Sequence, residues 1–291
     1  MNETRNDFEI CKTIVIDFIA EKLNDDINNL KYFDILQLKY DIKYGCDNPK
    51  DFDCDTAKIV NAIIILVWSD YFQEFNLNSV GRFKDYRGDT MNSFKTMFGN
   101  TLIGNQFIGD KNGTYTTDLM LLNDIEDFYH KYHTIGNVIV LPDNGRIDVS
   151  RKNFITSILQ TKPESINNYR GMHNPGFSDY FDTFLFELEN IFLDKQKYDI
   201  GLSALFTKNN YYFEKFPKSK TGFLKFCNIN FLQDYLNDDD STNNNIFNHY
   251  IYRKNITNYA KDAKSYIKTS TTIINNRADI IIKILQKKLD L

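Results

Sequence analysis

The sequence predicts a mainly α-helical, multi-helix globular protein with a small β-hairpin and a long C-terminal helix. Apolar residues recur every three or four positions over several stretches, which is the spacing of an amphipathic helix. Prolines, which interrupt helices, number only 5 among 291 residues. The 24 phenylalanines and 18 tyrosines supply enough apolar surface for a large packed core.

The first helix is predicted from Phe8 to Leu23, where the apolar side chains recur at helical spacing. The polar run Asn24–Asn29 should end it. Residues 30–44 fit either a short helix or a strand. A second helix should begin at a cap, either Asp55 or Thr56, and run to about residue 75. It is apolar nearly all round, which favours a central, buried position.

In the middle of the sequence, we expect a connecting segment at 76–88 and helices at about 90–99 and 118–133. A β-rich run follows at Val138–Leu141, then the turn residues Pro142-Asp143-Asn144-Gly145, then the alternating run Arg146–Val149. We therefore expect the hairpin at residues 138–149.

Further helices are predicted at about 151–160, 178–194 and 221–236. The run 237–245 is the best linker in the sequence, and it separates a core domain at 1–240 from a C-terminal helix within 246–291. This helix should either pack on the core or pair with a second subunit or another protein. Its predicted apolar seam consists of Tyr259, Ala263, Tyr266, Ser270, Ile273, Arg277, Ile280 and Ile284. Arg277 on that seam fits a buried pair partner, an interface contact or a phosphate ligand.

Composition excludes several classes of protein. The net charge of −4 gives no general attraction to nucleic acid or acidic membranes, although a local basic patch stays open. The longest apolar run, Ala62–Trp68, is too short to cross a bilayer, and the N-terminus lacks the pattern of a signal peptide. We expect a cytoplasmic protein without a membrane segment. The four cysteines show no zinc-ligand spacing, so no metal site is predicted from them.

A cluster of polar residues between Tyr129 and Asp182 is the candidate site. Motifs of the best-known hydrolases, nucleotide-binding loops and zinc proteases are absent from the sequence, but three of its four histidines fall in this window. The predicted catalytic residues are His133, Arg170, Asp179 and Asp182. The predicted substrate-binding residues are Arg146, Asn167 and Asn137.

Each of these residue types has a functional and a structural interpretation. His133 could transfer protons, or offset a helix dipole as a C-terminal cap. An arginine fork such as Arg170 could clamp a phosphate, or tie a loop to a carboxylate. No cofactor is predicted, although Mg²⁺ is possible. Asp179 and Asp182 lie three residues apart and could bind Mg²⁺ or serve as an acid/base pair, or could interact favourably with the dipole at a helix N-terminus.

The order of several short motifs resembles an uncharacterised bacterial protein family over residues 50–240. The motifs are "DCDTAKIVNAIIILVWSDYFQEFNL", "YHTIGNVIVLPDNGRID", "SINNYRG", "DYFDTFLFELE" and "CNINFLQDYLND". The family has no established activity. The resemblance implies that its pattern includes Thr134, Gly136, Arg146, Asn167, Arg170, Gly171, Asp179, Asp182 and Asp234.

Two hypotheses about function follow. The first is an antiphage-defence or toxin-like bacterial effector that acts on RNA or a nucleotide through the cluster of His, Arg and Asp. The second is a non-catalytic module that binds a protein partner, or a second copy of itself, through the C-terminal helix. The sequence alone does not decide whether the protein is an enzyme.

Overall fold

The computed structural model describes residues 2–45, 57–74, 83–87, 101–103, 106–109, 123–124, 127–128, 130–131, 133–142, 189, 192–193, 216–238 and 259–291. Over these residues the chain is mainly helical, as the sequence predicts. The helices expected at 90–99 and 151–160, and most of that expected at 178–194, lie outside the described residues. The helix predicted at 118–133 is described in part: residues 123–124, 127–128 and 130–131 are helical.

Helix α1 (Asn2–Lys22) confirms the first predicted helix. Its buried face carries Cys11, Val15, Phe18 and Ile19, spaced as one side of a helix requires. The helix ends where Asn24 and Asp25 take left-handed backbone angles, with φ of 54° and 59°. Asparagine and aspartate tolerate this conformation better than most residues, so the polar run ends the helix as expected.

The ambiguous segment at 30–44 is neither a regular α-helix nor a strand. It contains the end of one short 3₁₀ helix, η1 (Ile27–Tyr32), and a second, η2 (Ile35–Leu38). An aspartate caps each of them: Asp26 accepts from the Asn28 amide and Asp34 from the Leu36 amide, both at 2.9 Å. Side-chain capping of this kind competes with longer secondary structure.

Helix α2 (Lys58–Glu74) is the buried central helix that the sequence predicts. Its apolar residues are buried on almost every side, and Val60, Ile63 and Leu66 have at most 1% of their surface exposed. Trp68 donates its indole N–H to the Ile229 carbonyl at 2.8 Å. The proposed caps, residues 55 and 56, lie outside the described residues.

Strand β4 (Val138–Pro142) forms where a strand was predicted, but the predicted hairpin is not supported. β4 pairs antiparallel with β1 (Phe83–Arg87), so that Asp85 lies opposite Val140. Residues 83–87 were expected to be connecting chain, and that prediction is wrong. The second half of the predicted hairpin, 146–149, lies outside the described residues. Strand pairing depends on tertiary packing, which can override the signal of local turn residues.

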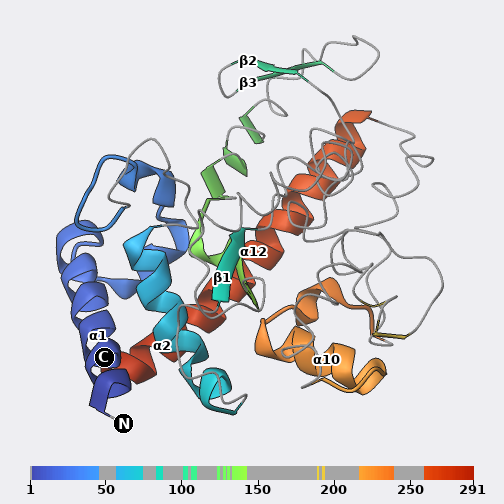
Figure 1. Ribbon diagram of the computed structural model, residues 1–291. Coiled ribbons are helices and arrows are strands. Elements are labelled where there is room, and N and C mark those ends of the chain that lie inside the picture. Colours follow the sequence, from blue (N-terminus) through green and yellow to red (C-terminus); the bar gives the residue numbers. More distant parts are fainter. Residues whose placement is uncertain are drawn as a thin grey trace, which may run out of the picture.

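A second small sheet joins β2 (Thr101–Ile103) to β3 (Gln106–Gly109) in an antiparallel pair. Both sheets are short additions to a helical body (Figure 1).

Helix α10 (Lys220–Ile229) is shorter than the helix predicted at 221–236. Ser219 caps its start through the Gly222 amide at 3.3 Å. It ends because Phe231 adopts a left-handed conformation with φ of 56°, after which a 3₁₀ helix, η8 (Gln233–Tyr235), follows. Hydrophobic spacing alone does not reveal such a stop.

Helix α12 (Tyr259–Leu289) confirms the long C-terminal helix. Ser270, Ile273 and Arg277 of the predicted seam are buried, whereas Ile280 is 36% exposed. The buried face continues instead through Ile281. A straight helix has 3.6 residues per turn, so a strict seven-residue seam drifts off its buried face.

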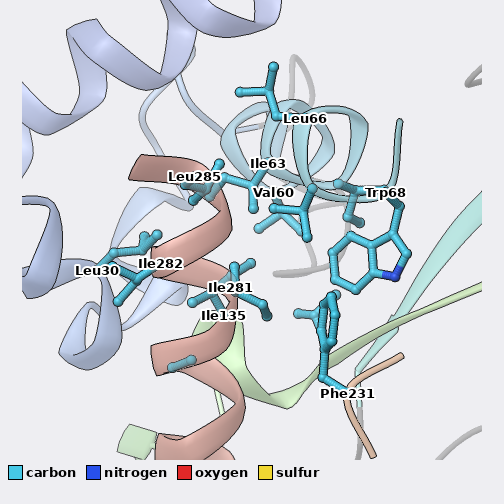
Figure 2. Packing of buried hydrophobic residues seen from close by; sticks show 14 of the residues in the cluster. Leu30, Val60, Ile63, Leu66, Trp68, Ile135, Phe231, Ile281, Ile282 and Leu285 are labelled. Carbon is cyan, nitrogen blue, oxygen red and sulfur yellow. The ribbon is translucent and has the colours of Figure 1, made fainter. Parts of the chain in front are cut away.

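The hydrophobic core lies between α2 and α12. Figure 2 shows Val60 and Ile63 of α2 facing Ile281 and Leu285 of α12. The remaining walls come from α1, η1 and the segments around residues 135 and 231 (Figures 1 and 2). Among the described helices, none has the length and apolarity needed to cross a bilayer.

Candidate functional site

Five of the seven residues predicted to form the site lie outside the described residues: Arg146, Asn167, Arg170, Asp179 and Asp182. The structure describes His133 and Asn137, together with their neighbour His130.

His133 and Asn137 are buried. Asn137 is the last residue of the 3₁₀ helix η6 (Ile135–Asn137) and His133 lies two residues before that helix; they are 0% and 3% exposed. The His133 carbonyl accepts a hydrogen bond from the Ile35 amide at 3.2 Å, which ties this segment to η2. A buried imidazole orients or supports other groups more readily than it reaches a large substrate. The catalytic role predicted for His133 stays a prediction.

Asp34 lies between two imidazoles. Its Oδ2 is 3.3 Å from Nδ1 of His130, and its Oδ1 is 4.0 Å from Nδ1 of His133. The same Oδ1 accepts from the Leu36 amide at 2.9 Å, so the capping role at η2 fixes the carboxylate. Only 12% of the Asp34 side chain is exposed, which shields the carboxylate from competing water.

His130 is the accessible member of this group, with 54% of its side chain exposed. An ionised carboxylate has no proton to donate, so a hydrogen bond between Asp34 and His130 requires the proton on Nδ1. Nε2 of the neutral ring then carries the basic lone pair. An imidazole held in one tautomer by a carboxylate is the arrangement that enzymes use for general base catalysis.

Sequence analysis identified only one region of this pair. His130 belongs to the polar window, but its neighbour His133 was chosen as the catalytic residue. Asp34 was missed because 96 positions separate it from His130 and no local motif joins them. One signal was present: an aspartate directly before a short apolar run is typical of a capping residue.

Arg277 takes part in a second polar centre, which is buried. The residue is 1% exposed, and its guanidinium donates to main-chain carbonyls of two other segments. Nε donates to Phe231 at 3.1 Å, and Nη2 donates to Asn230 at 3.0 Å and to Val138 at 2.6 Å. Nη1 donates to Gly136. Burial lowers the pKa of Arg277 to about 10, so it stays protonated at neutral pH.

The sequence left three roles open for Arg277: a buried pair partner, an interface contact or a phosphate ligand. These contacts support a buried role for this residue, with backbone carbonyls as the partners. Its donors are directed at the protein's own backbone, in the way that a guanidinium with several fixed N–H groups can bridge separate segments. Within the described part of the chain, no group of three or more His, Cys, Asp or Glu residues is arranged to hold a metal ion.

Comparison with known proteins adds no assignment. No family model, curated protein or solved structure matches the chain. The resemblance to an uncharacterised bacterial family stays a prediction. Three positions of its pattern have contacts that the structure describes: Thr134 donates its hydroxyl to the Lys131 carbonyl at 2.8 Å, Gly136 lies against the α12 backbone, and Asp234 accepts from Asn276 at 2.7 Å.

Proposed function

We propose that the protein is an enzyme that acts on RNA or a nucleotide, with His130 and Asp34 as its proton-transfer pair. The observation that carries the proposal is the exposed imidazole of His130 at 3.3 Å from a shielded carboxylate. In this proposal His130, and not His133, is the residue that exchanges protons with the substrate. His133 becomes a supporting group behind Asp34.

The pair suits substrates that lose or gain a proton at a hydroxyl or phosphate oxygen. Nε2 of His130 would accept the proton of an attacking hydroxyl or water, while Asp34 stabilises the imidazolium that forms. The same ring would then return the proton to the leaving oxygen. Positioned proton transfer contributes roughly 10²- to 10⁴-fold to a rate.

Recognition of phosphate would come from the predicted residues of the polar window. Arg146 and Arg170 are the arginines that the sequence assigns to phosphate, and Asp179 and Asp182 could orient them or bind Mg²⁺. A bacterial effector of the antiphage or toxin type is the biological setting we propose for such an activity. The abundance of Asn, Ile and Lys, typical of AT-rich genomes, supports a bacterial or phage-related source.

The test compares the wild-type protein with His130→Asn and Asp34→Asn. His249→Asn serves as a matched control because it changes a histidine outside the polar window. Each protein is expressed in bacteria and its effect on growth is measured, and the purified proteins are incubated with RNA and with nucleotides. We expect both site variants to lose about 10²- to 10⁴-fold in turnover and the control to lose none.

Two results would contradict the proposal. If the wild-type protein affects neither growth nor any RNA or nucleotide, the assigned substrate class is wrong. If it turns a substrate over and His130→Asn does so equally well, the pair is not the proton-transfer group.

The non-catalytic hypothesis relied on the seam of the C-terminal helix. From Ile273 to Leu289 the buried face of α12 packs against the chain's own core, which favours packing of this helix on the core over binding of a partner. Sedimentation of the wild-type protein checks this point. A dimer that Ile281→Asp converts to a folded monomer would favour the seam as an interface.

A further inference from the structure

Three neighbouring residues of α12 hold three separate segments of the chain. Asn276 donates to Asp234 of η8, and Asp279 accepts from Lys31 of η1 at 2.6 and 2.8 Å. Arg277 lies between them and donates to the carbonyls of residues 136, 138, 230 and 231. Helix α12 therefore contacts both β4, through Arg277, and η1, through Asp279.

Arg277 is the buried member of this set. Removing a guanidinium from water is unfavourable, and protein interiors retain one only where its N–H groups are satisfied. Here the donors bridge η6 and β4 on one side and the end of α10 on the other. A single side chain thus fixes the position of residues 136–138 relative to α12.

Hydrogen bonds connect that segment to residues adjacent in sequence to the proton-transfer pair. The Asn137 amide donates to the Thr134 carbonyl at 3.0 Å. The amide and the hydroxyl of Thr134 both donate to the Lys131 carbonyl, at 3.1 and 2.8 Å. Lys131 adjoins His130. On the other branch, the Ile35 amide donates to the His133 carbonyl, next to Asp34.

We propose that Arg277 is a positioning residue that holds Lys131 and residues 133–138 in place and thereby keeps the His130 imidazole against Asp34. The inference rests on the proposed function for its catalytic meaning, because the pair is the proposed reaction centre. The geometric part can be measured without any substrate.

The experiment reads the tautomer of His130 by NMR, from the ¹⁵N shifts and couplings of its imidazole at a pH where the ring is neutral. The His130→Asn spectrum assigns the signal, and Asp34→Asn defines complete loss of the carboxylate's influence. Arg277→Lys keeps the charge but cannot reproduce a guanidinium's fixed set of donors. Asn276→Ala is the matched control, since it removes the adjacent helix contact and leaves residues 136–138 untouched.

We expect Arg277→Lys to shift the His130 tautomer ratio most of the way to the Asp34→Asn value, and Asn276→Ala to leave it unchanged. A folded Arg277→Lys protein with the wild-type ratio would overturn the proposal, because a merely structural role changes stability alone.

If Arg277→Lys does not fold, Thr134→Val decides, since it removes one hydrogen bond along the same route. A partial shift of the ratio supports the proposal, and an unchanged ratio overturns it. Failure of the proposed function looks different: turnover would be insensitive to His130→Asn whatever the tautomer ratio does.

Discussion

Gly136 allows the segment that carries η6 to lie directly against α12, and replacing it with alanine should destabilise the protein severely. A Cβ at this position would lie 2.0 Å from the Ile274 carbonyl oxygen, 2.9 Å from its carbon and 3.1 Å from Cβ of Ala278. Real Cβ atoms essentially never approach closer than 3.0 Å. The obstacle is backbone of a long helix, so relief requires η6 and α12 to move apart.

The size of the effect can be estimated from two contributions. Overpacking a tight interior costs about 1–3 kcal/mol, and the upper part of that range applies where backbone must move. Separating the segments also weakens the hydrogen bond from Arg277 to the Gly136 carbonyl. A bond to a charged donor contributes roughly 1.5–3 kcal/mol. Together they predict a loss of about 3–6 kcal/mol, a large fraction of the 5–15 kcal/mol typical of a folded domain.

Urea unfolding followed by fluorescence measures this loss. Trp68 is the only tryptophan and is 1% exposed, so its emission reports the core between α2 and α12. The double variant Gly136→Ala/Ala278→Gly tests the cause, with Ala278→Gly alone as its reference. Because the nearest atom is the Ile274 oxygen, the second change should not rescue the first. A loss below about 1 kcal/mol, or full rescue, would refute the reasoning.

Three further predictions concern other parts of the fold. Trp68→Phe leaves the buried Ile229 carbonyl without its 2.8 Å donor and should cost about 1–3 kcal/mol, measured by circular dichroism. The hydrogen bond from Lys22 lowers the pKa of Asp41 in the folded protein. The ionised carboxylate therefore stabilises the fold at pH values above the ordinary pKa of aspartate. This contribution is lost as the pH falls through the lowered pKa. Asp41→Asn should therefore cost about 1 kcal/mol at pH 7, and urea titrations at decreasing pH should show the difference closing; a constant difference would contradict the assignment. Burial raises the pKa of Cys227, so iodoacetamide followed by peptide mass spectrometry should label it only after unfolding, and rapid labelling of the native protein would be inconsistent with the structure.

Periodicity predicted the parts of the fold that depend on a buried helical face. α1 and α12 follow from apolar residues at helical spacing, and α2 follows from a long segment that is apolar nearly all round. It failed where single contacts decide the local structure. Asp26 and Asp34 set 3₁₀ helices through capping bonds, and a left-handed Phe231 stops α10 early.

The candidate site was only half predictable for a related reason. The window that contains His130 stood out because histidines are rare in this sequence. Asp34 precedes α2 in the sequence and His130 follows it, so only the folded structure brings them together. No rule based on sequence spacing predicts this contact. Arg277 stood out as a charge on an apolar seam, but only the structure shows that its partners include backbone carbonyls of Gly136 and Phe231.

The position of α12 along the chain has a consequence for synthesis. α2 leaves the ribosome roughly 200 residues before Ile267–Leu289, the segment that covers it, and at typical elongation rates this interval lasts about 10–40 s. During that time α2, which is apolar nearly all round, lacks the part of its cover that α12 provides. Chaperones that bind exposed apolar segments should therefore associate with the nascent chain through α2 and leave once α12 has docked.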